Sequence, residues 1–185
     1  MHSRTITKGF INLGVFLTTL FVVIAGLQPV SYAQQEGLTY FLDESISYDP
    51  AIPTPKEVLG YELGEWHVRH DQLVEYMYAV AEASDRVTIS EYARTYENRK
   101  LLSLIITSPE NHTKLEEIKE AHQQLSNASR SGEVDLGSMP VVVQMSYSVH
   151  GNEASGANAS LAVVYRLAAG QGAEMENMLS NAIIL

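Results

Sequence analysis

A histidine and a glutamate three residues apart, His150 and Glu153, are the residues whose types and spacing best suit chemistry. They lie in residues 148–156 (SVHGNEASG), between a valine-rich run and an alanine-rich run. Imidazole nitrogen and carboxylate oxygen are both common ligands of Zn²⁺, and a tight turn would bring the two side chains together. We therefore expect a metal site here. A solvated surface turn is the alternative that the spacing alone leaves open.

Two predicted elements position this pair. Residues 140–147, with three consecutive valines, predict a buried strand, and residues 155–169 predict a helix that stops at Gly170. Sites in open α/β sheets collect beyond the carboxyl ends of strands, which is where the pair falls. We expect Gly151 to permit a tight turn and Ser155 to cap the helix. The helical spacing predicts an inner face of Leu161, Val164, Tyr165 and Ala168.

The remaining elements predict an α/β fold with a mixed, mostly buried sheet flanked by helices. We expect helices over residues 69–83, 109–128, 155–169 and 174–179, and strands near residues 87–92, 101–106, 140–147 and 181–185. The second helix is expected to bury Leu115, Ile118, His122 and Leu125. Because the chain stops inside a run typical of a buried strand, we expect it to be the N-terminal piece of a longer protein.

The first 33 residues predict a secretory signal peptide. Two basic residues precede a long uncharged apolar run, and Ser31 and Ala33 place small residues before a cut at Gln34. The run is long enough to span a bilayer, so an uncleaved anchor is the alternative. A proline and the small-residue site after the run favour cleavage after Ala33. We expect an exported bacterial protein, periplasmic or secreted, that leaves the membrane once it is cleaved.

Residues 34–59 are predicted to be an extended lead-in, and residues 60–185 to form the α/β domain. Pro50, Pro53 and Pro55 lie in the lead-in, and spaced prolines oppose both a helix and a central strand. We therefore expect this segment to run over the surface without regular structure.

Composition excludes several classes of function. The 185 residues include no cysteine, and 12 Lys and Arg stand against 22 Asp and Glu, a net charge of −10. A chain without cysteine has no disulfide scaffold, no Cys-ligated metal and no thiol nucleophile. An acidic chain with no basic cluster lacks the charge pattern of a nucleic-acid binder. Nothing in the sequence specifies an oligomeric state.

Other histidines are weaker candidates. His67 and His70, with Glu65 nearby, have the spacing of a metal pair, but they lie where an amphipathic helix begins. We interpret them as residues of a half-exposed helix start. His112 and His122 fall in a polar helix and are expected to be packed or partly solvated.

Two segments resemble the M14 zinc carboxypeptidases. Residues 149–156 (VHGNEASG) resemble the zinc-binding segment of this family, and residues 94–102 (RTYENRKLL) are similar to its Ser-x-Glu-Gly-Arg turn and following strand. Asn98 stands where the family usually has Gly, and Asn tolerates the left-handed backbone best after Gly. Residues 60–71 (GYELGEWHVRHD) look like exported bacterial members. The resemblance covers roughly residues 50–185.

The resemblance implies that His150 and Glu153 are two of three Zn²⁺ ligands. The third, a His, lies downstream in the family, as do the Arg groups that bind substrate and the Glu that acts as general base. Asn152 stands where pancreatic-type enzymes carry an Arg beside the ligand Glu. The extended substrate subsite to which that Arg contributes is therefore not expected here. The implied activity is removal of a C-terminal residue from a peptide substrate, with zinc polarising the scissile carbonyl.

Two alternatives to a carboxypeptidase remain. One is another hydrolase on the same fold, an amidase of cell-wall peptides or a deacylase. The other is a non-catalytic exported binding domain in which the half-site is structural. Because only two ligands are present, we expect the 185-residue chain alone to be inactive.

The exported protein is expected to begin at Gln34, since a small residue at position 33 marks the cut. N-terminal sequencing of secreted or periplasmic material measures this. Ala33→Arg should block cleavage, whereas the matched small substitution Ala33→Ser should allow it. A mature protein that keeps Met1 would contradict the signal peptide and support an anchor.

Overall fold

The structure is a computed structural model that describes residues 37–185, all within one compact unit. The predicted signal peptide and its cleavage site lie outside the described residues. From residue 37 onward, no helix is both long enough and apolar enough to cross a membrane.

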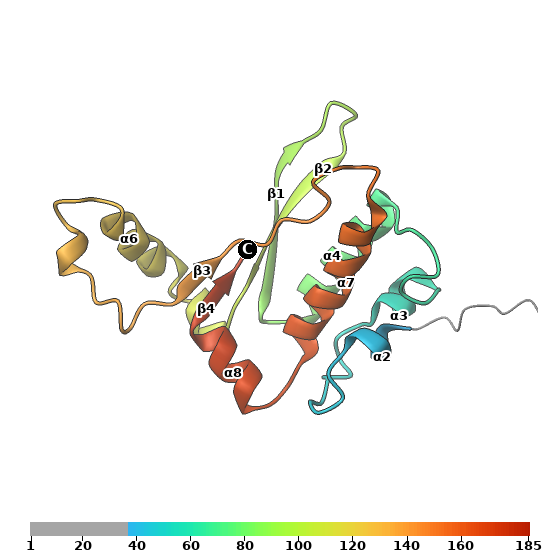
Figure 1. Cartoon of the computed structure of the whole chain (residues 1–185), viewed down its shortest axis with the longest axis horizontal. Helices are drawn as coiled ribbons and strands as arrows, with labels where there is room; N and C mark the ends of the chain where they lie inside the picture. Colours follow the sequence, from blue (N-terminus) through green and yellow to red (C-terminus); the bar gives the residue numbers. More distant parts are fainter. Residues whose placement is uncertain (1–36) are drawn as a thin grey trace, which may run out of the picture. The chain divides into compact units, whose positions relative to one another are not determined.

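Four strands form an open mixed sheet in the order β1-β2-β4-β3 (Figure 1). The strands are β1 (Val87–Arg94), β2 (Lys100–Ile106), β3 (Val141–Val143) and β4 (Ala182–Ile184). β1 and β2 form an antiparallel hairpin, β2 pairs antiparallel with β4, and β3 lies parallel to β4. The predicted α/β class with a mixed sheet is confirmed.

Seven α-helices and one 3-10 helix are found within residues 37–185. They are α2 (Leu38–Phe41), α3 (Pro55–Leu59), α4 (His70–Ala83), α5 (Pro109–His112), α6 (Leu115–Leu125), η1 (Ser131–Glu133), α7 (Ala154–Ala169) and α8 (Ala173–Ser180). α4 packs against both α7 and β1, and these elements enclose the core. The predicted helices over residues 69–83, 155–169 and 174–179 are confirmed to within one residue at each end.

The core is built where α4 and α7 meet the sheet. Tyr76 and Val80 of α4 and Leu161 of α7 have no solvent exposure, and burial raises the pKa of Tyr76. The predicted inner face of α7 is confirmed, because Leu161, Val164, Tyr165 and Ala168 are all buried. Gly170 ends the helix, as expected.

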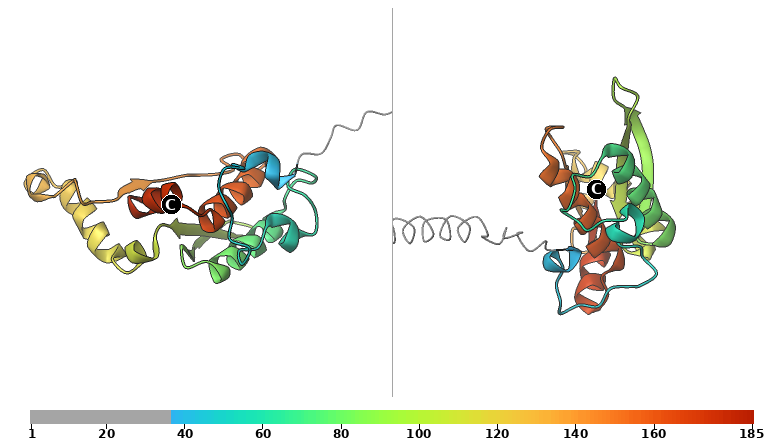
Figure 2. Two further views of the ribbon diagram at one scale, coloured as in Figure 1. Left: turned by 90° about the horizontal axis from the view of Figure 1, so that it is seen from below. Right: turned by 90° about the vertical axis from the view of Figure 1, so that its right-hand side faces the viewer.

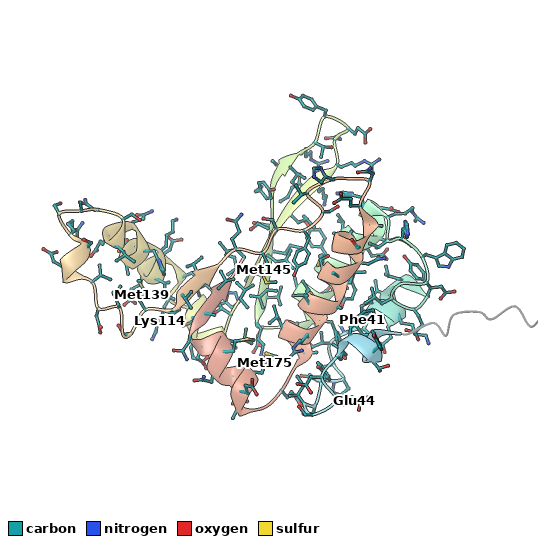
Figure 3. All side chains as sticks on the ribbon, in the orientation of Figure 1. Phe41, Glu44, Lys114, Met139, Met145 and Met175 are labelled. Carbon is teal, nitrogen blue, oxygen red and sulfur yellow. The ribbon has the colours of Figure 1, made fainter. Side chains whose placement is uncertain are left out.

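The predicted helix over residues 109–128 is two helices, and its predicted inner face is at most half-buried: Leu115, Ile118 and His122 are partly covered. Lys114 leaves the helical conformation at the junction of α5 and α6 (Figure 3), where the Thr113 hydroxyl donates to the Glu110 carbonyl at 2.7 Å. No residue of α6 is buried, and Leu125 is exposed. Figures 1 and 2 show that α6 lies beyond β3, away from α4 and α7, so it does not pack on the helices that enclose the core.

The predicted buried strand over residues 140–147 is also shorter and more exposed than expected. β3 comprises only Val141–Val143, and these side chains are 40% to 54% exposed. β3 pairs with β4 on one side and is an edge of the sheet within the described residues. The sequence does not reveal this exposure, because three consecutive valines predict a strand whether or not another element covers it.

The lead-in differs from the predicted extended segment, since it contains α2 and α3. Pro55 occupies the first turn of α3, where a missing N–H costs nothing, so this proline favours the helix instead of opposing it. Thr54 and Glu57 form a capping box in front of that turn. The lead-in also packs on α7, because the Tyr48 ring stacks on Tyr165 with centroids 5.6 Å apart.

A buried polar cluster fixes the corner between α8 and β4. The hydroxyl of fully buried Thr107 lies 2.7 Å from the Ala182 carbonyl oxygen and 3.0 Å from that of Leu179. The Asn111 amide donates to Thr107 Oγ1 at 3.0 Å and to the Ser180 carbonyl at 3.0 Å. Carbonyls at a helix end lack helical partners, and here side chains supply them. The cluster therefore ties β4 to the end of β2.

Thr107→Val is expected to lower the free energy of unfolding by about 1–3 kcal/mol, because it keeps the shape but removes the hydroxyl from buried polar partners. Urea unfolding followed by circular dichroism measures the loss. Thr88→Val, at an exposed position on β1, is the matched control and should change stability by less than about 0.5 kcal/mol. Equal stability of the two variants would contradict the role given to Thr107.

Candidate metal centre

The His–Glu pair lies in the connection from β3 to α7. Residues 144–153 carry no helix or strand and lead from β3 to the N-terminal end of α7 (Figure 1). The backbone N–H of Met145, labelled in Figure 3, donates to the Leu185 carbonyl at 2.7 Å, so the connection stays beside β4 at its start. The order of elements around the pair is therefore the predicted one, with a longer connection.

His150 and Glu153 form the two ends of a β-turn. The Glu153 backbone N–H donates to the His150 carbonyl at 3.0 Å. Such a turn holds its end Cα atoms within about 7 Å of each other. The structure therefore brings the two predicted site residues together through a local hydrogen bond and needs no long-range contact to do so.

Both side chains are exposed, so an ion from solvent has access to them. Glu153 is the N-cap residue of α7, and its carboxylate forms no capping hydrogen bond. The partial positive charge of a helix N-terminus favours a carboxylate at this position. One imidazole and one carboxylate fit two positions of a zinc site. No cluster of three or more metal-binding side chains is found among residues 37–185.

The backbone of the connection differs from the prediction in two respects. Gly151 does not carry the positive φ, which falls instead on Ser148 at 61°. Ser155 does not cap α7, because Glu153 is the N-cap residue. Neither central residue of the turn, Gly151 or Asn152, has a positive φ, so the turn does not require a glycine. The left-handed residue of the connection is Ser148, two residues before His150.

Asn158, on the second turn of α7, is a structural residue near the pair that the sequence did not reveal. Its Oδ1 accepts the Val68 N–H at 3.1 Å, and its Nδ2 donates to the Trp66 carbonyl at 3.4 Å. The side chain therefore fastens the segment before α4 to α7. The one available signal was an Asn inside a helix, where this residue is intrinsically unfavourable.

Three other histidines lie within hydrogen-bond distance of backbone carbonyls. The Nε2 atoms of His70, His112 and His122 lie 2.8, 2.9 and 2.9 Å from the carbonyl oxygens of Lys100, Arg86 and Pro140. His67 is exposed. These positions agree with the structural interpretation given to all four histidines.

The second motif forms the turn of the β1–β2 hairpin. Asn98 has φ 61°, which confirms the left-handed backbone expected where the family usually has Gly. The Thr95 N–H donates to the Arg99 carbonyl at 2.9 Å, and Glu97 pairs with Arg99 at 2.8 Å. Both segments that carry the resemblance thus have a defined local structure.

Comparison with known families decides the assignment. The model of the zinc carboxypeptidase family, peptidase M14, matches residues 73–185. The chain belongs to the zinc carboxypeptidase family. Searches of curated proteins and of solved structures found no match. The family match runs from α4 to β4 and includes both the hairpin turn and the His–Glu turn.

The match to zinc carboxypeptidases begins later than the resemblance seen in the sequence. Residues 60–71, which look like exported bacterial members, precede the matched residues. That likeness stays a prediction. A zinc carboxypeptidase-type domain is established at the level of the family, and the ligands His150 and Glu153 remain predicted ligands.

Proposed function

We propose that this chain is part of an exported zinc metallocarboxypeptidase in which His150 and Glu153 bind the metal. The β-turn that joins the two residues carries the proposal, because it pairs an imidazole with a carboxylate in an exposed position. Membership of the zinc carboxypeptidase family supports zinc as the metal. A third ligand would come from outside the described residues, and we propose a His encoded downstream of residue 185.

The chain's own residues would orient the metal. His150 offers a neutral ring nitrogen, and Glu153 offers a carboxylate held at the start of α7. The buried face of α7 prevents that helix from shifting, so the Glu153 backbone has a fixed position. When bound, zinc acts as a Lewis acid toward the scissile carbonyl and lowers the pKa of a coordinated water to about 7.

The proposed substrate is a peptide that loses its C-terminal residue. Asn152, between the two ligands, is exposed and uncharged. An amide there would contact a peptide backbone through hydrogen bonds, with no fixed positive charge to select an acidic side chain. The same fold would also serve an amidase of cell-wall peptides or a deacylase, and the substrate assay below separates these activities.

The protein expressed from its whole reading frame is expected to contain about one zinc per chain. His150→Ala and Glu153→Ala should each reduce the zinc content to a small fraction, since each removes a ligand. Inductively coupled plasma mass spectrometry on dialysed protein measures this. Glu174→Ala, which removes an exposed carboxylate beyond the opposite end of α7, is the matched control and should keep its zinc. Full zinc content in both ligand variants would refute the site.

Hydrolysis of N-blocked peptides should release the free C-terminal amino acid. A chelator should abolish the reaction and added Zn²⁺ should restore it, whereas peptides amidated at the C-terminus should resist cleavage. Mass spectrometry of the products measures which bond is cut. Cleavage of cell-wall peptides at an internal amide, or release of an acyl group, would replace the carboxypeptidase assignment. A zinc-loaded protein that cuts none of these would indicate a binding domain.

A further inference from the structure

The connection that carries His150 and Glu153 touches the first turn of α7 at Gly156. A Cβ atom added to Gly156 would lie 3.0 Å from the backbone nitrogen of Ser148 and 3.5 Å from its Cα. The first distance is shorter than nearly all contacts that real Cβ atoms make, so the neighbour would have to move by a few tenths of an ångström. The neighbour is backbone, which cannot rotate away as a side chain does.

Backbone conformation does not explain why a glycine occupies position 156. Gly156 lies inside α7 and does not have a positive φ. Glycine is a poor helix residue compared with alanine, so this position works against the stability of the helix. The close approach of the Ser148 backbone is the feature of the structure that requires the missing side chain.

Ser148, on the other side of this contact, has an unusual backbone. Its φ of 61° places a residue with a side chain in the left-handed region, where only Asn98 joins it among the described non-glycine residues. A β-branched residue cannot adopt this conformation without strain, whereas glycine adopts it freely. Ser148 turns the chain two residues before His150. A change of backbone conformation at Ser148 would therefore shift the residues that follow it, including His150.

We propose that Gly156 and Ser148 are positioning residues for the zinc ligands. Their contact holds the start of the connection against α7, the helix that carries Glu153 at its N-cap. His150 and Glu153 are therefore both positioned relative to α7. Residues that orient metal ligands typically change metal affinity by about 10–100-fold when they are replaced. This inference rests on the proposed zinc site.

Two substitutions disturb the contact from opposite sides. Gly156→Ala inserts a methyl group against the Ser148 backbone, and it also improves the helix propensity of α7. Ser148→Val keeps Gly156 but opposes the positive φ. Ser148→Gly is the conservative variant at the same position, because it keeps both the backbone contact and the left-handed conformation. Gly132→Ala is the matched control, since no atom lies within 4 Å of the added Cβ there.

The experiment uses the protein expressed from its whole reading frame. Zinc affinity is measured by competition with a chromophoric chelator, the Co²⁺-substituted protein is examined by visible absorption, and thermal unfolding is followed in the metal-free state. We expect Gly156→Ala and Ser148→Val to bind zinc about 10–100-fold more weakly and to change the Co²⁺ spectrum. Ser148→Gly and Gly132→Ala should remain within about threefold of the parent.

Metal-free unfolding separates positioning from a merely structural role. The inference predicts weaker zinc binding by variants that are fully folded at the temperature of the measurement. If Gly156→Ala does not fold, the zinc affinities of Ser148→Val and Ser148→Gly are compared, and only a weaker affinity of Ser148→Val supports the positioning role.

Parental zinc affinity in folded Gly156→Ala and Ser148→Val would overturn the inference. Parental zinc affinity in His150→Ala and Glu153→Ala would instead overturn the proposed function, so the two failures are distinguishable.

Discussion

The burial of one helix, α7, is the constraint on which the rest of this structure depends. Its inner face includes Leu161, which has no solvent exposure, and it packs against α4 beside the sheet. Tyr165 adds the stacking contact with Tyr48 of the lead-in. Because burial of these side chains fixes both the axis and the rotation of α7, it also fixes the N-terminal end where Glu153 lies.

The candidate metal centre is attached to α7 by local interactions. One backbone hydrogen bond joins Glu153 to His150, and one close approach joins Ser148 to Gly156. Neither feature buries His150 or Glu153, the two proposed ligands, which stay accessible to solvent. A packed helix with an exposed turn at its start suits the proposed site, because it limits how far the backbones of the two residues can move apart.

Side-chain patterns made most of the fold predictable, and contacts between distant elements account for what was missed. The helical spacing in α7 predicted its buried face correctly, because a packed helix really did lie opposite it. The same kind of spacing in α6 predicted a buried face that is at most half-buried, since an apolar stripe does not reveal how completely other elements cover it. Spaced prolines predict the absence of a helix, whereas Pro55 lies in the first turn of α3, where proline favours one. The Ser148–Gly156 contact has no pattern in the sequence, because it joins backbone to a missing side chain.

Diffraction from crystals of the whole zinc-loaded protein, recorded on both sides of the zinc absorption edge, tests the central claim most directly. We expect a single anomalous peak about 2.0–2.2 Å from a ring nitrogen of His150 and from a carboxylate oxygen of Glu153. A zinc peak ligated by other residues, with both of these side chains remote from it, would contradict the account.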